Sequence, residues 1–280
     1  MEAETLFRRL ERRGRAAYAK DCAGCALTLK GSYLEAEVTL ENCLLEARDL
    51  MDEILEAEVL ADLCCLAYQS QDIDAMKKWI TQINYIKSEQ IIWQLYRASS
   101  MNALLELDCG NVMDAERLIV QFLEKYSSYM DSSGRVEMNL CLCLCYKMQG
   151  RIQDLGETLS ALLNGDWKLC YPQLGHFHSH LYRGAQLLQG TPMVHDAICL
   201  LTASVRLRTL SEFGASHRTE LMEKTLLSLL HEDYALEKRE ACTMSNDFLM
   251  NMGIDEIISF FRKVLFQYLN SIKPEPVVTK

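Results

Sequence analysis

The sequence contains few of the residues that interrupt helices. Only four prolines and thirteen glycines occur among its 280 residues, and no convincing run alternates Val, Ile or Thr. The long stretches between them are rich in Leu, Ala, Glu, Met and Gln, which lose little side-chain freedom in a helix. Because 49% of the residues are hydrophobic, the chain can bury a core. The composition therefore predicts an all-α fold and excludes disorder for most of the chain.

The chain also lacks an excess of positive charge and a long hydrophobic run. Its formal net charge is −10, which argues against nucleic acid as a direct partner, because phosphate binding needs concentrated cations. No apolar run reaches the roughly 18 residues that span a bilayer, and no secretory signal opens the chain. We therefore expect no membrane insertion and a cytoplasmic or nuclear location, where the twelve cysteines would be reduced thiols.

Motifs for catalysis are missing as well. The sequence has no HExxH, no Walker-type loop, no GxSxG and no dinucleotide fingerprint. Two short cysteine patterns, the CxxC pair of Cys22 and Cys25 and the run Cys141, Cys143 and Cys145, fall in apolar helical segments. A structural zinc site normally needs a second pair at suitable spacing. We expect these cysteines to pack as small hydrophobic residues, and we expect neither an enzyme nor a cofactor.

One histidine cluster leaves an alternative open. His176, His178 and His180 alternate in GHFHSHL, and His176 and His180 are four residues apart. On a helix this spacing would bring two imidazoles to one metal. The alternative function is thus a metal-binding protein or an enzyme that uses these histidines and nearby cysteines. The simpler interpretation is two histidines on the exposed face of a helix.

A period of about 40 residues runs through the chain. Turn residues recur at Gly31, Gln71, Gly110, Gly150 and Gly190. Small or apolar residues follow each of the first four turns at two, five, nine and twelve residues, and this spacing places them on one face of a helix. They are Tyr33, Ala36, Leu40 and Cys43; Ile73, Met76, Ile80 and Ile83; Val112, Ala115, Ile119 and Phe122; and Ile152, Leu155, Leu159 and Leu162. After the fifth turn the series returns, displaced by two residues, as Val194, Ala197, Leu201 and Ser204.

The segments GSYLEA, GNVMDA and GRIQDL show this pattern most clearly, and it resembles the tetratricopeptide repeat. The resemblance covers about residues 16–210 and is better in the second helix of each repeat than in the first. Small residues seven before the turns, such as Gly24, Cys64 and Ala103, would let two helices approach closely. The resemblance implies an α-solenoid of about five helical hairpins, in which each hairpin packs on its neighbours.

Four parts make up the predicted organisation. Residues 1–15 form a basic N-terminal helix or extension, 16–210 the repeats, 211–272 C-terminal capping helices and 273–280 a disordered tail. The last helix, from Ile257 to Leu269, is apolar nearly all round and must be buried. It either caps the solenoid or docks a partner or a second copy of the chain. Lys273 lies in a four-residue pattern that resembles a SUMO-acceptor site, a match that also arises by accident.

The resemblance implies a protein-binding scaffold, an adaptor or subunit of a larger intracellular complex. Its inner face, formed by the first helices, would bind a peptide segment or a helix of another protein. The residues predicted to line this face are Tyr68, Ser100, Leu104, Leu107, Leu140, Leu144, Lys147 and His180. The alternative for the leucines is that long helices bury them against one another.

Overall fold

The computed structural model describes residues 2–9, 12–165, 174–210, 221–226, 228 and 254–272. These residues are mostly helical, and no β-strand occurs among them, so the predicted all-α class is confirmed. They fall into two compact units, one up to residue 126 and the other from residue 127. The predicted tail with Lys273 lies outside the described residues.

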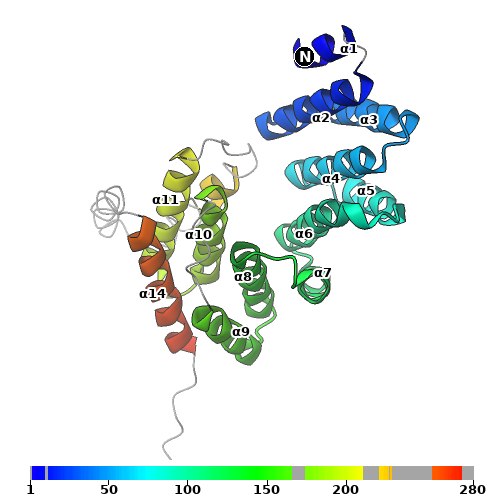
Figure 1. The fold of residues 1–280 in the computed structure, drawn as a ribbon. Helices are drawn as coiled ribbons and strands as arrows, with labels where there is room; N and C mark the ends of the chain where they lie inside the picture. Colours follow the sequence, from blue (N-terminus) through cyan, green and yellow to red (C-terminus); the bar gives the residue numbers. More distant parts are fainter. Residues whose placement is uncertain are drawn as a thin grey trace, which may run out of the picture. The chain divides into compact units, whose positions relative to one another are not determined.

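The first unit consists of consecutive helices that pack on their neighbours in chain order (Figure 1). Its helices are α1 (Glu2–Arg9), α2 (Arg13–Lys30), α3 (Tyr33–Asp49), α4 (Glu53–Ser70), α5 (Ile73–Tyr85), the short 3₁₀ helix η1 (Glu89–Ile91), α6 (Ile92–Asp108) and α7 (Val112–Tyr126). Helix α4 contacts both α2 and α3, and α6 contacts both α4 and α5. Because α2 begins at Arg13, the predicted boundary after residue 15 falls inside a helix.

The second unit contains α8 (Ser132–Met148), α9 (Ile152–Asn164), α10 (Leu174–Leu188), α11 (Val194–Leu210) and α14 (Ile254–Ile272). Helix α8 packs on α9 and α10, and α10 packs on α11. Helix α14 lies against α9, α10 and α11 (Figure 1). Residues 221–226 are also helical.

The predicted turn residues end the first helix of each hairpin. All five have a positive φ: 85° at Gly31, 61° at Gln71, 81° at Gly110, 70° at Gly150 and 71° at Gly190. A left-handed residue lets the next amide reach back to a carbonyl of the last helical turn. At four of the five turns this amide donates to the carbonyl five residues earlier, as Ser32 donates to Leu27 at 3.0 Å. Glycine suits such a position because it has no Cβ.

The second helices bury the apolar face that the period predicts. In α3, Ala36, Leu40 and Cys43 are buried, and the corresponding residues of α7 and α9 are buried too. The small residues of the first helices sit where helices approach closely. A Cβ on Gly24 of α2 would lie 2.5 Å from Cδ2 of Leu40, so only glycine fits at this position without a shift of the neighbouring side chain.

The predicted burial of the last helix is confirmed for most of its apolar side chains. Seven are buried in α14: Ile257, Ile258, Phe261, Val264, Leu265, Tyr268 and Leu269. Phe261 packs so closely on α10 that a Cβ on Gly184 would lie 2.4 Å from its ring. The Arg262 guanidinium donates to the Leu163 carbonyl at 2.9 Å. Helix α14 therefore covers the apolar surface of α9–α11 with its own apolar side.

Candidate functional site

The predicted partner-binding residues of the first unit lie on α4 and α6. Tyr68 donates its hydroxyl to Asp108 at 3.2 Å, and Ser100 donates to the Arg97 carbonyl at 2.8 Å. Leu104 and Leu107 are each 6% exposed. These two leucines contribute to packing and offer little surface to a partner.

The predicted residues of the second unit are mostly buried. Leu140, Leu144 and His180 lie in the core. Lys147 points to the end of α10, where its ammonium group donates to the carbonyl oxygens of Gln186 at 3.3 Å, Leu187 at 2.8 Å and Gln189 at 2.5 Å. A lysine at this place satisfies the carbonyls at a helix C-terminus and interacts favourably with its dipole. Burial lowers the pKa of Lys147.

The burial of these leucines agrees with the alternative in which long helices bury them against one another, and partner binding at the inner face stays a prediction. The predicted metal-binding histidines are only partly described. His176 and His178 belong to α10, but their side chains lie outside the described part of the chain. His180 is fully buried, in contrast to the exposed position of the simpler interpretation.

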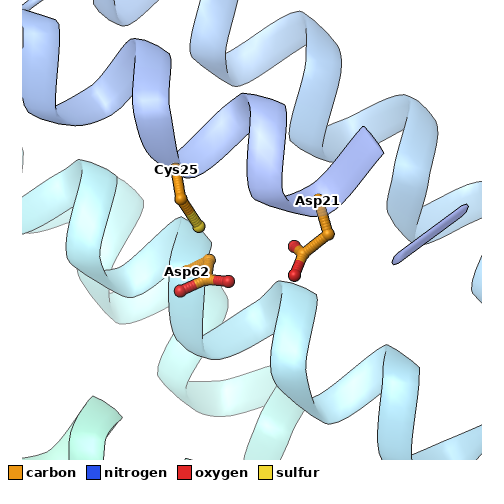
Figure 2. A group of neighbouring side chains, drawn as sticks. All are labelled: Asp21, Cys25 and Asp62. Atoms are coloured by element: carbon orange, nitrogen blue, oxygen red, sulfur yellow. The ribbon is translucent and has the colours of Figure 1, made fainter. Parts of the chain in front are cut away.

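Three side chains on α2 and α4 form what we call the acidic–thiol cluster: Asp21, Cys25 and Asp62. Asp21 and Cys25 are four residues apart, so α2 presents both on one face. Asp62 approaches them from α4, and Figure 2 shows all three side chains pointing toward one another. One potential ligand atom of each, a carboxylate oxygen or the Sγ of Cys25, lies within 4.8 Å of the others.

A second layer of charge surrounds the cluster. Arg97 of α6 forms ion pairs with both Asp62 and Glu58, and Gln94 donates to Glu58 at 2.7 Å. Asp21 is only 3% exposed, and its Oδ1 accepts no hydrogen bond from any described residue. An ionised carboxylate in such a place lacks most of the solvation it would have in water.

These surroundings change the acidity of the cluster. Burial and the nearby charge of Asp62 raise the pKa of Asp21 to about 8, although Arg97 opposes the shift. Burial and Asp62 also raise the pKa of the Cys25 thiol above its ordinary value. At neutral pH both groups therefore hold their protons in the metal-free protein. A nucleophilic cysteine needs a lowered pKa, which is opposite to the shift of the Cys25 thiol.

A separate apolar groove runs between α2 and α3, with a volume of about 980 Å³. Its apolar lining comes from Ala23, Ala26, Leu27, Leu34 and Val38, and its polar lining from Glu4, Lys20, Lys30, Glu35, Thr39 and Asn42. We call it the α2–α3 groove. Leu34 is 81% and Val38 61% exposed. Leu45, seven residues further on, continues the same side of α3 and is 60% exposed.

Neither the acidic–thiol cluster nor the α2–α3 groove was predicted from the sequence. A second helix with a buried face at Ala36 and Leu40 needs polar residues elsewhere, and Leu34 and Val38 break that rule at helical spacing. This pair, Leu34 and Val38, was the signal in the sequence that could have predicted the α2–α3 groove.

A second groove of about 920 Å³ lies between α9 and α14. Its polar lining comes from Gln153, Glu157, Ser160 and Asn164, and its apolar lining from Ile152, Ala161, Leu269 and Ile272.

Comparisons with known proteins give no family for the chain. No protein-family model matches the sequence, and a search of curated proteins found no match. Among the described residues, no helix is long and apolar enough to cross a membrane.

Proposed function

We propose that the protein is a tetratricopeptide-like α-solenoid that binds another protein, as an adaptor or a subunit of a larger intracellular complex. The repeated local geometry supports this proposal. The five turn residues recur about every 40 residues and share a left-handed conformation. Within each unit, the first helix of a hairpin packs against the first helix of the next, as α2 does with α4 and α8 with α10. An array of this kind presents long surfaces between its helices.

The observation that carries the proposal is the α2–α3 groove, where large apolar side chains are exposed side by side. Single exposed apolar residues are ordinary, but a contiguous apolar groove with a polar rim is typical of an interaction surface. Leu34, Val38 and Leu45 lie along one side of α3, so they form a stripe rather than a single point. This shape suits an elongated occupant.

The occupant that fits is an amphipathic helix of a partner protein. In this fold a helix already packs against two helices of a hairpin, since α4 contacts both α2 and α3. A partner helix on the α2–α3 groove would repeat this mode of packing with apolar residues at i, i+3, i+4 and i+7. Lys30 and Glu35 at the rim can pair with charges of either sign on its flanks. Burying Leu34 would contribute about 1.5–3 kcal/mol.

A pair of variants tests the proposal. Leu34→Glu with Val38→Glu places two charges in the groove, whereas Met113→Glu is the matched control. Met113 also lies three residues after a turn glycine and is 70% exposed, but it belongs to α7. All three positions are on the surface, so circular dichroism should show unchanged helicity and a similar Tm for each variant.

Affinity purification from cells with quantitative mass spectrometry is the first readout. We expect a protein that the wild type and Met113→Glu recover and the groove variant loses. A synthetic helix from that protein should bind the wild type in a fluorescence anisotropy titration. Leu34→Glu should weaken the binding by roughly 10-fold to 100-fold, the equivalent of one buried leucine. Equal recovery and equal peptide affinity for the groove variant and the control would remove the groove as the binding site.

A further inference from the structure

We propose that Asp21, Cys25 and Asp62 bind a zinc ion that links α2 to α4. The site is distinct from the α2–α3 groove, and the proposal does not depend on the helix-binding function. Two helices supply the three ligands: α2 presents Asp21 and Cys25 one turn apart, and α4 presents Asp62 (Figure 2). Their ligand atoms already lie within 4.8 Å of one another.

The buried carboxylate of Asp21 points to a missing ligand. It is 3% exposed, its Oδ1 has no hydrogen-bond partner among the described residues, and it faces Asp62 and Cys25. Leaving a buried acceptor without a partner costs free energy of about 1–3 kcal/mol, and more if it is charged. A cation held by these side chains supplies the partner that Oδ1 of Asp21 lacks.

The charges around the cluster favour a divalent ion. Three carboxylates, those of Asp21, Glu58 and Asp62, gather near a single guanidinium, that of Arg97. With these carboxylates ionised and the Cys25 thiol deprotonated as a zinc ligand, three negative charges remain after Arg97 is counted, and one divalent cation reduces them to one. Asp62 hydrogen-bonds with Asp21 and Cys25, whose protons a bound metal ion would replace, and Arg97 donates to Oδ1 of Asp62. Ligating carboxylates are commonly oriented by such a hydrogen bond to their other oxygen.

The ligand set fits zinc better than the other common divalent ions. Zinc accepts thiolate and carboxylate ligands at about 2.3 and 2.0–2.2 Å, in a tetrahedral arrangement. These bond lengths place ligand atoms about 3.5 Å apart, so small side-chain movements would close the present cluster around an ion. Calcium and magnesium need about six oxygen ligands. When zinc binds at neutral pH, the Cys25 thiol and the Asp21 carboxyl each release a proton to solvent, and a water molecule completes the fourth position.

Zinc binding to the full chain, purified without a histidine tag and treated with a chelator, tests the proposal. Isothermal titration with ZnCl₂ should give one ion per chain. X-ray absorption at the zinc edge should show one sulfur at about 2.3 Å and oxygen ligands at about 2.0 Å. Zinc should also raise the Tm, since a ligand that binds only the folded state stabilises it.

Three variants assign the ligands. Asp21→Asn and Cys25→Ser should each weaken zinc binding by about 100-fold or more, because the loss even of a supporting residue costs 10-fold to 100-fold. Cys22→Ser is the matched control, since Cys22 belongs to the same CxxC pair but is exposed, and it should bind as the wild type does. Circular dichroism checks that each variant is folded. Asn has the same shape as Asp, so Asp21→Asn should retain the fold.

Three results would overturn the proposal. The first is the absence of stoichiometric zinc in the folded wild-type chain. The second is a site with two sulfurs or with imidazole nitrogens, which would indicate the CxxC pair or the histidines. The third is unchanged affinity in a folded Asp21→Asn variant.

Discussion

Replacing Asp21 with Asn should stabilise the metal-free protein, and the gain should grow as the pH rises. The pKa of Asp21 is raised from 3.8 to about 8 in the folded chain. Below pH 3.8 the carboxyl is protonated in both the folded and the unfolded state, so it has no effect on the free energy of unfolding. Between these two pKa values, the unfolded chain ionises the group while the folded chain retains its proton.

The magnitude follows from the difference in bound protons. In that interval the wild type loses about 1.4 kcal/mol of its free energy of unfolding for each pH unit. From pH 3.8 to pH 7 the loss amounts to about 4 kcal/mol, an upper value because Asp62 and Asp21 titrate as a pair. Asn cannot ionise, and its amide can donate to Asp62 as the protonated carboxyl does. The advantage of Asp21→Asn should therefore be small near pH 4 and largest above pH 7.

Urea unfolding at pH 5, 6, 7 and 8 in the presence of a chelator measures this difference. Trp79 is buried in the core of the first unit, so its fluorescence reports the unfolding of the region that contains Asp21. Asp49→Asn is the control, since Asp49 is exposed on α3, and its stability should follow the wild type at every pH. A pH-independent gain for Asp21→Asn, or a loss of stability, would refute the argument that Asp21 retains its proton.

Three further predictions concern the packing and the turns. Gly184→Ala should destabilise the second unit by about 1–3 kcal/mol in urea unfolding, because its Cβ would lie 2.4 Å from the Phe261 ring; a neutral effect would show that α14 does not pack closely on α10. Lys147→Met should lower the free energy of unfolding by about 1–3 kcal/mol, because it leaves the carbonyls at the end of α10 without their donor. An unchanged Tm would contradict that role of Lys147. Gln71→Gly should stabilise the first unit by about 1 kcal/mol, since Gln71 has a φ of 61°, and destabilisation would argue against the left-handed turn.

The local features of the hairpins could be predicted because they depend on neighbours in the sequence. A left-handed turn requires glycine or a tolerant residue, so Gly31, Gly110 and Gly150 reveal its position directly. The buried face of each second helix has a period near 3.6, so Leu40 and Ile119 could be assigned to the core.

The face of the first helices could not be assigned in this way. For Leu104 and Leu140 the sequence left two alternatives open, an inner face that binds a partner and burial between long helices, and both leucines are buried. Periodicity does not distinguish a residue that faces a partner from one that faces another helix of the same chain.

The acidic–thiol cluster depends on contacts over a longer range. Asp21 and Asp62 are 41 residues apart in the sequence, about one repeat, and their pairing follows from the register in which α2 meets α4. The CxxC motif pairs Cys25 with Cys22, but Cys22 is exposed. The residue of the next hairpin that approaches Cys25 is Asp62. No short motif records such a combination.

Site-specific photo-crosslinking in cells tests most directly whether the α2–α3 groove holds a partner helix. A benzophenone amino acid placed at Leu34 should crosslink to one protein, whereas the same group at Met113 should not. Mass spectrometry of the product should locate the crosslink in a segment with apolar residues at i, i+3, i+4 and i+7. No crosslink from Leu34, the same products from both positions, or a crosslink to this chain alone would contradict the proposed function.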